Sequence, residues 1–115
     1  MSAVRAFYFD KFWMPAQIDY LPESIQLAAF GCAVNQGLAA FPKLLQTAIH
    51  RMGHPIIVDG DLGPATLAAA NAVNALWLAD SFRLAREEAY LDLADAHATQ
   101  RDFLRGWLNR LRSGL

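Results

Sequence analysis

Apolar residues recur along most of this chain at intervals of three and four positions, which is the spacing of an α-helix that buries one face. Between residues 23 and 36 the stripe consists of Ile25, Ala28, Ala29, Cys32 and Ala33. A second stripe, in the segment that begins near residue 41, consists of Leu45, Ala48, Ile49 and Met52. Alternating apolar and β-branched residues are nearly absent, so the pattern predicts an all-α fold.

Prolines and glycines divide this pattern into five or six helices, which we expect to pack as one compact bundle. Residues 4–13 are predicted to form a short aromatic helix, followed by a loop over 14–22. Gly37 is expected to end the second helix, and Gly53 with Pro55 the third. A helix then runs to about residue 77, and a longer one carries the stripe Phe82, Ala85, Ala89 and Leu93. A final amphipathic helix contains Phe103, Leu104, Trp107, Leu108 and Leu111. All gaps are short, so residues 1–115 are predicted to form a single domain.

The composition predicts an interaction surface. Apolar residues make up 55% of the 115 residues and charged residues only 18%. A domain of this size cannot hide all of that apolar surface, and a large exposed patch normally marks a site of interaction. We therefore expect a protein partner or self-association, such as a homodimer.

Charge and chemistry exclude several other classes of function. The net charge of −1 and the scattered basic residues do not form the basic patch that nucleic-acid binding requires. The single cysteine, Cys32, is expected to be a small buried apolar residue. His50 and His54 are separated by a helix break, and the loop at Asp59 and Asp61 lacks the glutamate that ends a calcium loop. We predict no metal and no cofactor.

Neither a signal peptide nor a membrane span is expected. The first residues include charges and lack the uninterrupted apolar run of a secretory signal. No stretch reaches the roughly 18 uncharged apolar residues that a membrane-spanning helix needs. We expect synthesis in the cytoplasm, with access to the periplasm by a phage or secretion route.

The turn at residues 58–67, V-D-G-D-L-G-P-A-T-L, is the most informative segment. Gly60 and Gly63 allow backbone angles that other residues avoid, Pro64 suits the first turn of a helix, and Asp61 is a candidate N-cap. The segment resembles the V-D-G-x-x-G-P-x-T turn of predicted peptidoglycan-binding domains. Such domains form the C-terminal part of the phage-type N-acetylmuramidases and secretion activators of glycosyl hydrolase family 108.

Four further segments are similar to that family in the same order. The aromatic segment 6–15 ends in F-W-M-P, and residues 30–37 resemble the family's F-D-x-x-V-N-x-G helix with Gly31 in place of aspartate. L-L-Q at 44–46 and G-W-L-N-R at 106–110 complete the series. The resemblance implies a lysozyme-like C-terminal lobe that binds peptidoglycan. The ligand-binding residues carried over from it are Trp13, Asn35, Gln46, Asp59, Asp61 and Thr66.

The same resemblance argues against catalysis. The family's catalytic glutamate lies in an E-G-G motif, which this sequence lacks. Cleavage of a glycosidic bond ordinarily requires a carboxylic acid and a second carboxylate. The three glutamates, Glu23, Glu87 and Glu88, are better explained as a helix-start residue and a solvated face. We expect no catalytic residues and a non-catalytic peptidoglycan-binding module.

Two alternatives remain open. The chain could be a phage- or prophage-encoded interaction module, an inhibitor or regulator, whose apolar face binds a partner or a second copy. Arg101 and Arg105, at i and i+4, are candidate partner contacts. It could also be a fragment of an active muramidase. Among the tryptophans, Trp77 and Trp107 are predicted to lie in the core, whereas Trp13 is equally compatible with a sugar-stacking role.

Overall fold

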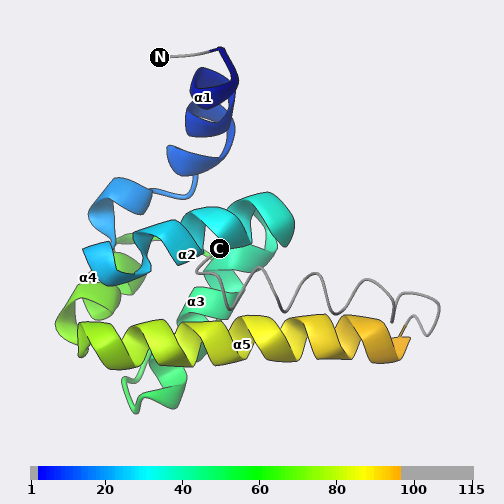
Figure 1. Ribbon diagram of the computed structural model, residues 1–115. Coiled ribbons are helices and arrows are strands. Elements are labelled where there is room, and N and C mark those ends of the chain that lie inside the picture. Colours follow the sequence, from blue (N-terminus) through cyan, green and yellow to red (C-terminus); the bar gives the residue numbers. More distant parts are fainter. Residues whose placement is uncertain (1–2, 97–115) are drawn as a thin grey trace.

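The computed structural model describes the backbone of residues 3–96 and the side chains of residues 3–94, and within that range it is all-α, as predicted (Figure 1). Its α-helices are α1 (Ala3–Tyr8), α2 (Glu23–Asn35), α3 (Ala40–Arg51), α4 (Pro64–Ala72) and α5 (Ala75–Ala96). A π-helical turn, η1 (Phe9–Trp13), continues α1, and a 3-10 turn, η2 (Ile18–Tyr20), interrupts the predicted loop. The predicted final helix, Trp107, Arg101 and Arg105 lie outside the described residues.

The core lies between α2, α3 and α5, which pack on one another (Figure 1). Both predicted stripes face it, with Ala28 and Met52 half-buried at its edge. Phe41 and Phe82 are fully buried and meet edge to face, with ring centroids 6.0 Å apart. The stripe on α5 was predicted too long: Leu93 is 39% exposed, whereas Tyr90 and Ala94 on the same part of α5 are buried.

The break between α4 and α5 lies earlier than the sequence pattern predicted. It falls at Val73 and Asn74, where the Asn74 Oδ1 accepts hydrogen bonds from the N–H groups of Leu76 and Trp77, both at 3.0 Å. These are the second and third residues of α5, so Asn74 is its N-cap. Trp77 consequently lies in the first turn of α5 with 71% of its surface exposed, and the prediction that it belongs to the core was wrong.

Replacing Asn74 with alanine is expected to lower the free energy of unfolding by about 1 kcal/mol, since both N–H groups lose their side-chain acceptor. Asn74→Asp retains an acceptor oxygen at the helix N-terminus and is the matched control, expected to remain within about 0.5 kcal/mol of wild type. Urea unfolding followed by circular dichroism measures both. Equal destabilisation by the two variants would show that Asn74 does not stabilise the protein by capping α5.

The N-terminal segment stands away from α3, α4 and α5 and approaches the rest of the molecule through α2 (Figure 1). Neither α1 nor η1 contains a buried residue. Gln17, which follows η1, adopts a left-handed backbone conformation with φ of 54°, and its side-chain amide donates to the Leu62 carbonyl at 2.9 Å. This hydrogen bond joins the N-terminal segment to the loop before α4.

Cys32 is a fully buried thiol in α2, as the sequence indicated. Burial raises its pKa to about 12, although the nearby Arg86 charge acts in the opposite direction. The native thiol is therefore expected to stay unmodified by a disulfide reagent at pH 8 and to react fully in denaturant. Because the folded pKa is the higher one, stability should be constant below the unfolded thiol's pKa of about 8.5 and decline above it. Rapid native labelling at pH 8 would contradict this burial.

Candidate functional site

The six residues predicted to bind ligand fall into two groups. Four of them line a small pocket of about 370 Å³ beside the 58–67 turn; they are Gln46, Asp59, Asp61 and Thr66. The other two, Trp13 and Asn35, line a larger pocket of about 580 Å³ between the N-terminal segment and α2. The two pockets share no lining residue, so the structure does not bring all six into one site.

Gln46 is the centre of the first group and is 1% exposed. Its Nε2 lies 3.0 Å from Asp59 Oδ1, 2.9 Å from the Asp61 carbonyl and 3.0 Å from Thr66 Oγ1. Its Oε1 accepts the Gly60 N–H at 2.8 Å. One side chain of α3 therefore holds together both sides of the turn, and Gln46 and Thr66 use their polar atoms within the fold.

The two aspartates of the turn differ in role. Asp59 Oδ1 also accepts the Asp61 N–H at 2.9 Å, and the hydrogen bonds from this N–H and from Gln46 lower the pKa of Asp59. Their stabilising effect should be present at neutral pH and lost as pH falls below the usual carboxyl range. Asp61 was predicted to be the N-cap of α4, but this prediction was wrong: Gly63 occupies the N-cap position, without a side-chain hydrogen bond. The exposed carboxylates of both residues remain candidates for a ligand.

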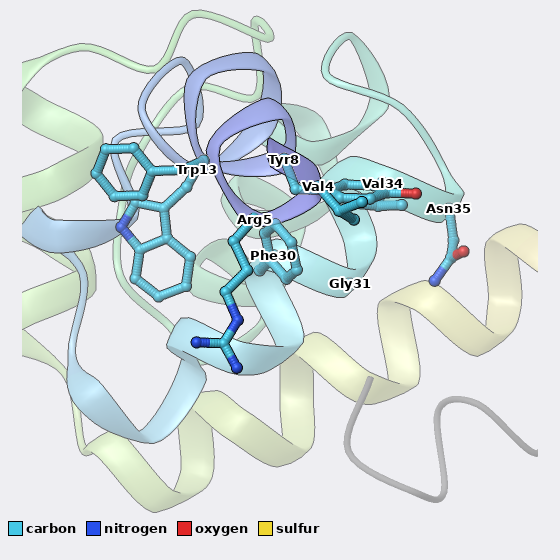
Figure 2. A pocket seen from close by; sticks show the side chains of 9 residues that line it. Val4, Arg5, Tyr8, Trp13, Phe30, Gly31, Val34 and Asn35 are labelled. Carbon is cyan, nitrogen blue, oxygen red and sulfur yellow. The ribbon is translucent and has the colours of Figure 1, made fainter. Parts of the chain in front are cut away.

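The larger pocket is lined mainly by aromatic and aliphatic side chains from two segments (Figure 2). α1 and η1 contribute one wall and α2 the other; the lining residues are Val4, Arg5, Tyr8, Phe9, Trp13, Phe30, Gly31, Val34 and Asn35. Small-molecule sites are typically concave, largely apolar and equipped with a few polar groups. We call this the aromatic pocket.

Ring contacts fix the shape of the aromatic pocket. The Trp13 ring lies 5.6 Å from Phe30, between centroids, and stacks on Phe9 at 6.5 Å. Tyr8 meets Phe30 edge to face at 6.3 Å. The indole Nε1 of Trp13 donates to Asp19 Oδ1 at 2.9 Å, which fixes the orientation of the ring. Such preorganised aromatic faces are suited to the apolar side of a ring-shaped ligand.

Two polar side chains lie at the margins of the aromatic pocket. Figure 2 shows Arg5 extending from α1 alongside Phe30, and Asn35 reaching from α2 towards α5. A guanidinium binds carboxylates and an amide both donates and accepts hydrogen bonds. Among the described residues that line this pocket there is no aspartate or glutamate. The arrangement can hold an amphipathic ligand.

Trp13 and Asn35 were predicted from the sequence to bind ligand, and Tyr8 was considered there as a sugar-stacking residue, but Arg5, Phe9 and Phe30 were missed. The available signal was the density of aromatics in residues 7–13, which exceeds what a short helix needs for packing. Gly31, where the family pattern has aspartate, is buried in α2 and lines the pocket.

Two further properties of the described chain bear on the type of site. Within residues 3–94, no three His, Cys, Asp or Glu side chains gather closely enough to hold a metal ion. Of the helices in that part of the molecule, none has both the length and the apolar character that crossing a bilayer demands.

Comparison with known proteins agrees with this division of the chain. Residues 42–112 match the family model described as a predicted peptidoglycan domain, and residues 1–37 match that of glycosyl hydrolase 108. The structure is similar to that of Brucella abortus SagA, with a TM-score of 0.79 and 26% sequence identity over 99% of this chain. The chain spans 62% of the SagA chain. No curated protein matches it. The turn at 58–67, with the Gln46 side chain that holds it, lies within the longer match, and the chain belongs to the family of predicted peptidoglycan domains.

Proposed function

We propose that this protein binds peptidoglycan through the aromatic pocket and does not cleave it. The observation that carries the proposal is a preorganised aromatic pocket, with no carboxylate among its described lining residues, in a chain of the predicted peptidoglycan domain family. The pocket lies in the segment that matches glycosyl hydrolase 108, so the proposed site lies outside the longer family match.

The chemistry of peptidoglycan suits this pocket. An N-acetylated sugar presents an apolar ring face and a methyl group, which can pack against Trp13 and Phe30. Its amide and hydroxyl groups can exchange hydrogen bonds with Asn35, which is exposed. Carboxylates of the muramic acid or of the stem peptide can pair with Arg5. One pocket thus offers a partner for each kind of group on the polymer.

The proposal that the protein does not cleave peptidoglycan rests on where its glutamates lie. A retaining or inverting glycosidase places two carboxyl groups on either side of the scissile bond. Glu88 forms an ion pair with Arg51 at 2.7 Å, Glu87 pairs with Arg83 at 3.3 Å, and Glu23 lies in the exposed first turn of α2. None of these lines the aromatic pocket.

Co-sedimentation with purified sacculi tests the binding, and a zymogram on cell walls tests the cutting. We expect the wild-type protein to pellet with sacculi in a saturable manner and to leave the walls intact. Failure to pellet would overturn the proposal, and a cleared zone would show instead that the chain retains muramidase activity. In the phage or prophage setting that we propose, lysis or a secretion route provides access to the wall.

A second function, as a protein-interaction module, is favoured by the outer surface of α1 and η1. Neither element contains a buried residue. Phe7 on α1 and Met14 just after η1 are exposed outside the aromatic pocket, and Val4, Tyr8 and Phe9, which also line that pocket, are exposed beside them. Consecutive exposed apolar residues of this kind are typical of a surface that packs on a partner. We infer that this surface binds a second copy of the chain or another protein.

Light scattering of the full chain tests this second function. A dimer that dissociates in a Phe7→Ser variant would support self-association, because Phe7 is 53% exposed and contributes little to the core. Leu84→Ser, on α5 and 49% exposed, is the matched control and should leave the mass unchanged. A monomer at all concentrations that also captures no partner would exclude this function.

A further inference from the structure

Arg86 is a buried charge whose hydrogen bonding is incomplete. It lies on α5 and is 1% exposed. Its Nε donates to Gln36 Oε1 at 2.7 Å and its Nη1 to the Ala28 carbonyl at 3.1 Å, both on the α2 side of the core. Its Nη2 is buried and has no hydrogen-bond partner among the described residues.

This arrangement leaves the Arg86 guanidinium without a carboxylate partner among the described residues. An arginine side chain stays protonated in proteins, and a buried charge is costly unless an opposite charge compensates it. Both acceptors of Arg86 are neutral oxygens, and no ion pair within the described chain includes it. A buried guanidinium of this kind is therefore an anchor for an anion.

Arg86 also lines a pocket of about 310 Å³ between α2 and α5. The exposed residues Ser24 and Asp80 line the same pocket, which is therefore continuous with the surface. Ser24 lies in the first turn of α2, where backbone N–H groups point outwards and no side chain caps the helix. The buried guanidinium and the start of the helix therefore both favour a negatively charged ligand in this pocket.

The other charges of the pocket limit the ligand to a single negative charge. Arg83 is already balanced by Asp80, at 4.0 Å, and by Glu87, at 3.3 Å. The side chain of Asp80 is 74% exposed and lies at the rim, where it opposes the entry of an anion. Arg83, Asp80 and Glu87 together carry one positive and two negative charges, which oppose a multiply charged anion, so a monoanion fits better than a phosphate.

We propose that the α2–α5 pocket binds the carboxylate group of a small molecule, with Arg86 Nη2 as the buried donor. This site shares no residue with the aromatic pocket and does not depend on peptidoglycan binding. A carboxylate oxygen accepts the unsatisfied N–H and supplies the missing negative charge in one contact. Apolar atoms of the ligand can pack on Leu27 and Ala79, which also line the pocket.

Acetate titration of the full chain, followed through the arginine Nε–H signals in ¹⁵N NMR spectra, tests this site without any variant. Sodium acetate replaces sodium chloride at constant ionic strength and pH 7. The Arg86 signal is expected to shift and saturate at acetate concentrations on the order of 10 mM, whereas Arg51 on α3 keeps its position. No saturable shift, or equal shifts at both arginines, would overturn the proposal.

A variant at the rim gives an independent measurement. Asp80→Asn removes the one carboxylate among the described residues that line the pocket, and we expect it to tighten acetate binding about threefold through reduced repulsion. Glu88→Gln, which removes a carboxylate on another part of α5, is the matched control and should leave the acetate affinity unchanged. Equal acetate affinities of wild type and Asp80→Asn would contradict the site. A change of the Arg86 signal in Asp80→Asn without acetate would also contradict it, because the substitution would then have removed a partner of Arg86. Loss of peptidoglycan binding alone would not affect either result.

Discussion

Replacing Gln46 with methionine is expected to lower the free energy of unfolding by about 3 kcal/mol, although the two side chains have similar size. The substitution removes the acceptor of the Gly60 N–H and the donor to Thr66 Oγ1, Asp59 Oδ1 and the Asp61 carbonyl. Thr66 is itself buried, so its hydroxyl must then rely on the weaker contact to the Asp61 carbonyl at 3.3 Å. Chemical denaturation measures the change.

The matched control for this effect is Gln26→Met. Gln26 is half-buried and makes one side-chain hydrogen bond, to the Leu21 carbonyl at 3.1 Å. We expect a loss of about 1 kcal/mol or less there. Equal losses at the two positions would mean that Gln46 does not hold the turn, and that its place in the family pattern has another origin.

Replacing Trp13 with alanine is expected to weaken binding to sacculi at least about tenfold, because a central aromatic residue of a binding pocket commonly contributes more than 1.4 kcal/mol. The indole forms one wall of the aromatic pocket through its contacts with Phe9 and Phe30. Co-sedimentation over a range of protein concentrations gives the two affinities.

Two controls separate binding from folding in this experiment. Trp77→Ala removes a tryptophan that is 71% exposed on α5 and lies outside the aromatic pocket, so its affinity should equal that of wild type. Asn35→Ala alters the pocket at an exposed position and should weaken binding with little change in the unfolding midpoint. Wild-type affinity in Trp13→Ala, or an equal loss in Trp77→Ala, would exclude the aromatic pocket as the site.

Helix positions could be predicted where the apolar period was long and uninterrupted. The stripe from Ile25 to Ala33 predicted both the helix and its buried face, because five small or apolar residues repeat at helical spacing. The break before α5 could not be placed in the same way. Apolar residues continue across it, and only the side chain of Asn74, acting as an N-cap, shows where the new helix starts.

The candidate site was predictable in part. The resemblance to the glycosyl hydrolase 108 family selected Gln46 and Thr66 as ligand-binding residues, but it could not distinguish a residue that binds a ligand from one that holds a turn. Hydrogen bonds between residues 13 and 20 positions apart supply that distinction, and they depend on how α3 packs against the turn. The ligand-binding role of Asp59 and Asp61 stays a prediction.

The aromatic pocket was hidden in the sequence for a similar reason. Its two walls are separated by the loop and η2, and neither wall alone differs from an ordinary apolar helix face. Tyr8 and Trp13 both contact Phe30 and form one surface with it only because α1 and η1 approach α2. The spacing of apolar residues along the sequence reveals a helical period, but it does not reveal contacts between distant segments.

The most direct test of peptidoglycan binding at the aromatic pocket is a titration of the ¹⁵N-labelled protein with a soluble disaccharide-peptide fragment of peptidoglycan. Side-chain signals report on both groups of candidate residues in the same spectrum. We predict that the Trp13 indole N–H and the Asn35 side-chain amide shift and saturate together, while the buried Gln46 amide keeps its position. A shift of the Gln46 amide without the Trp13 indole, or no saturable shift at either, would contradict the account.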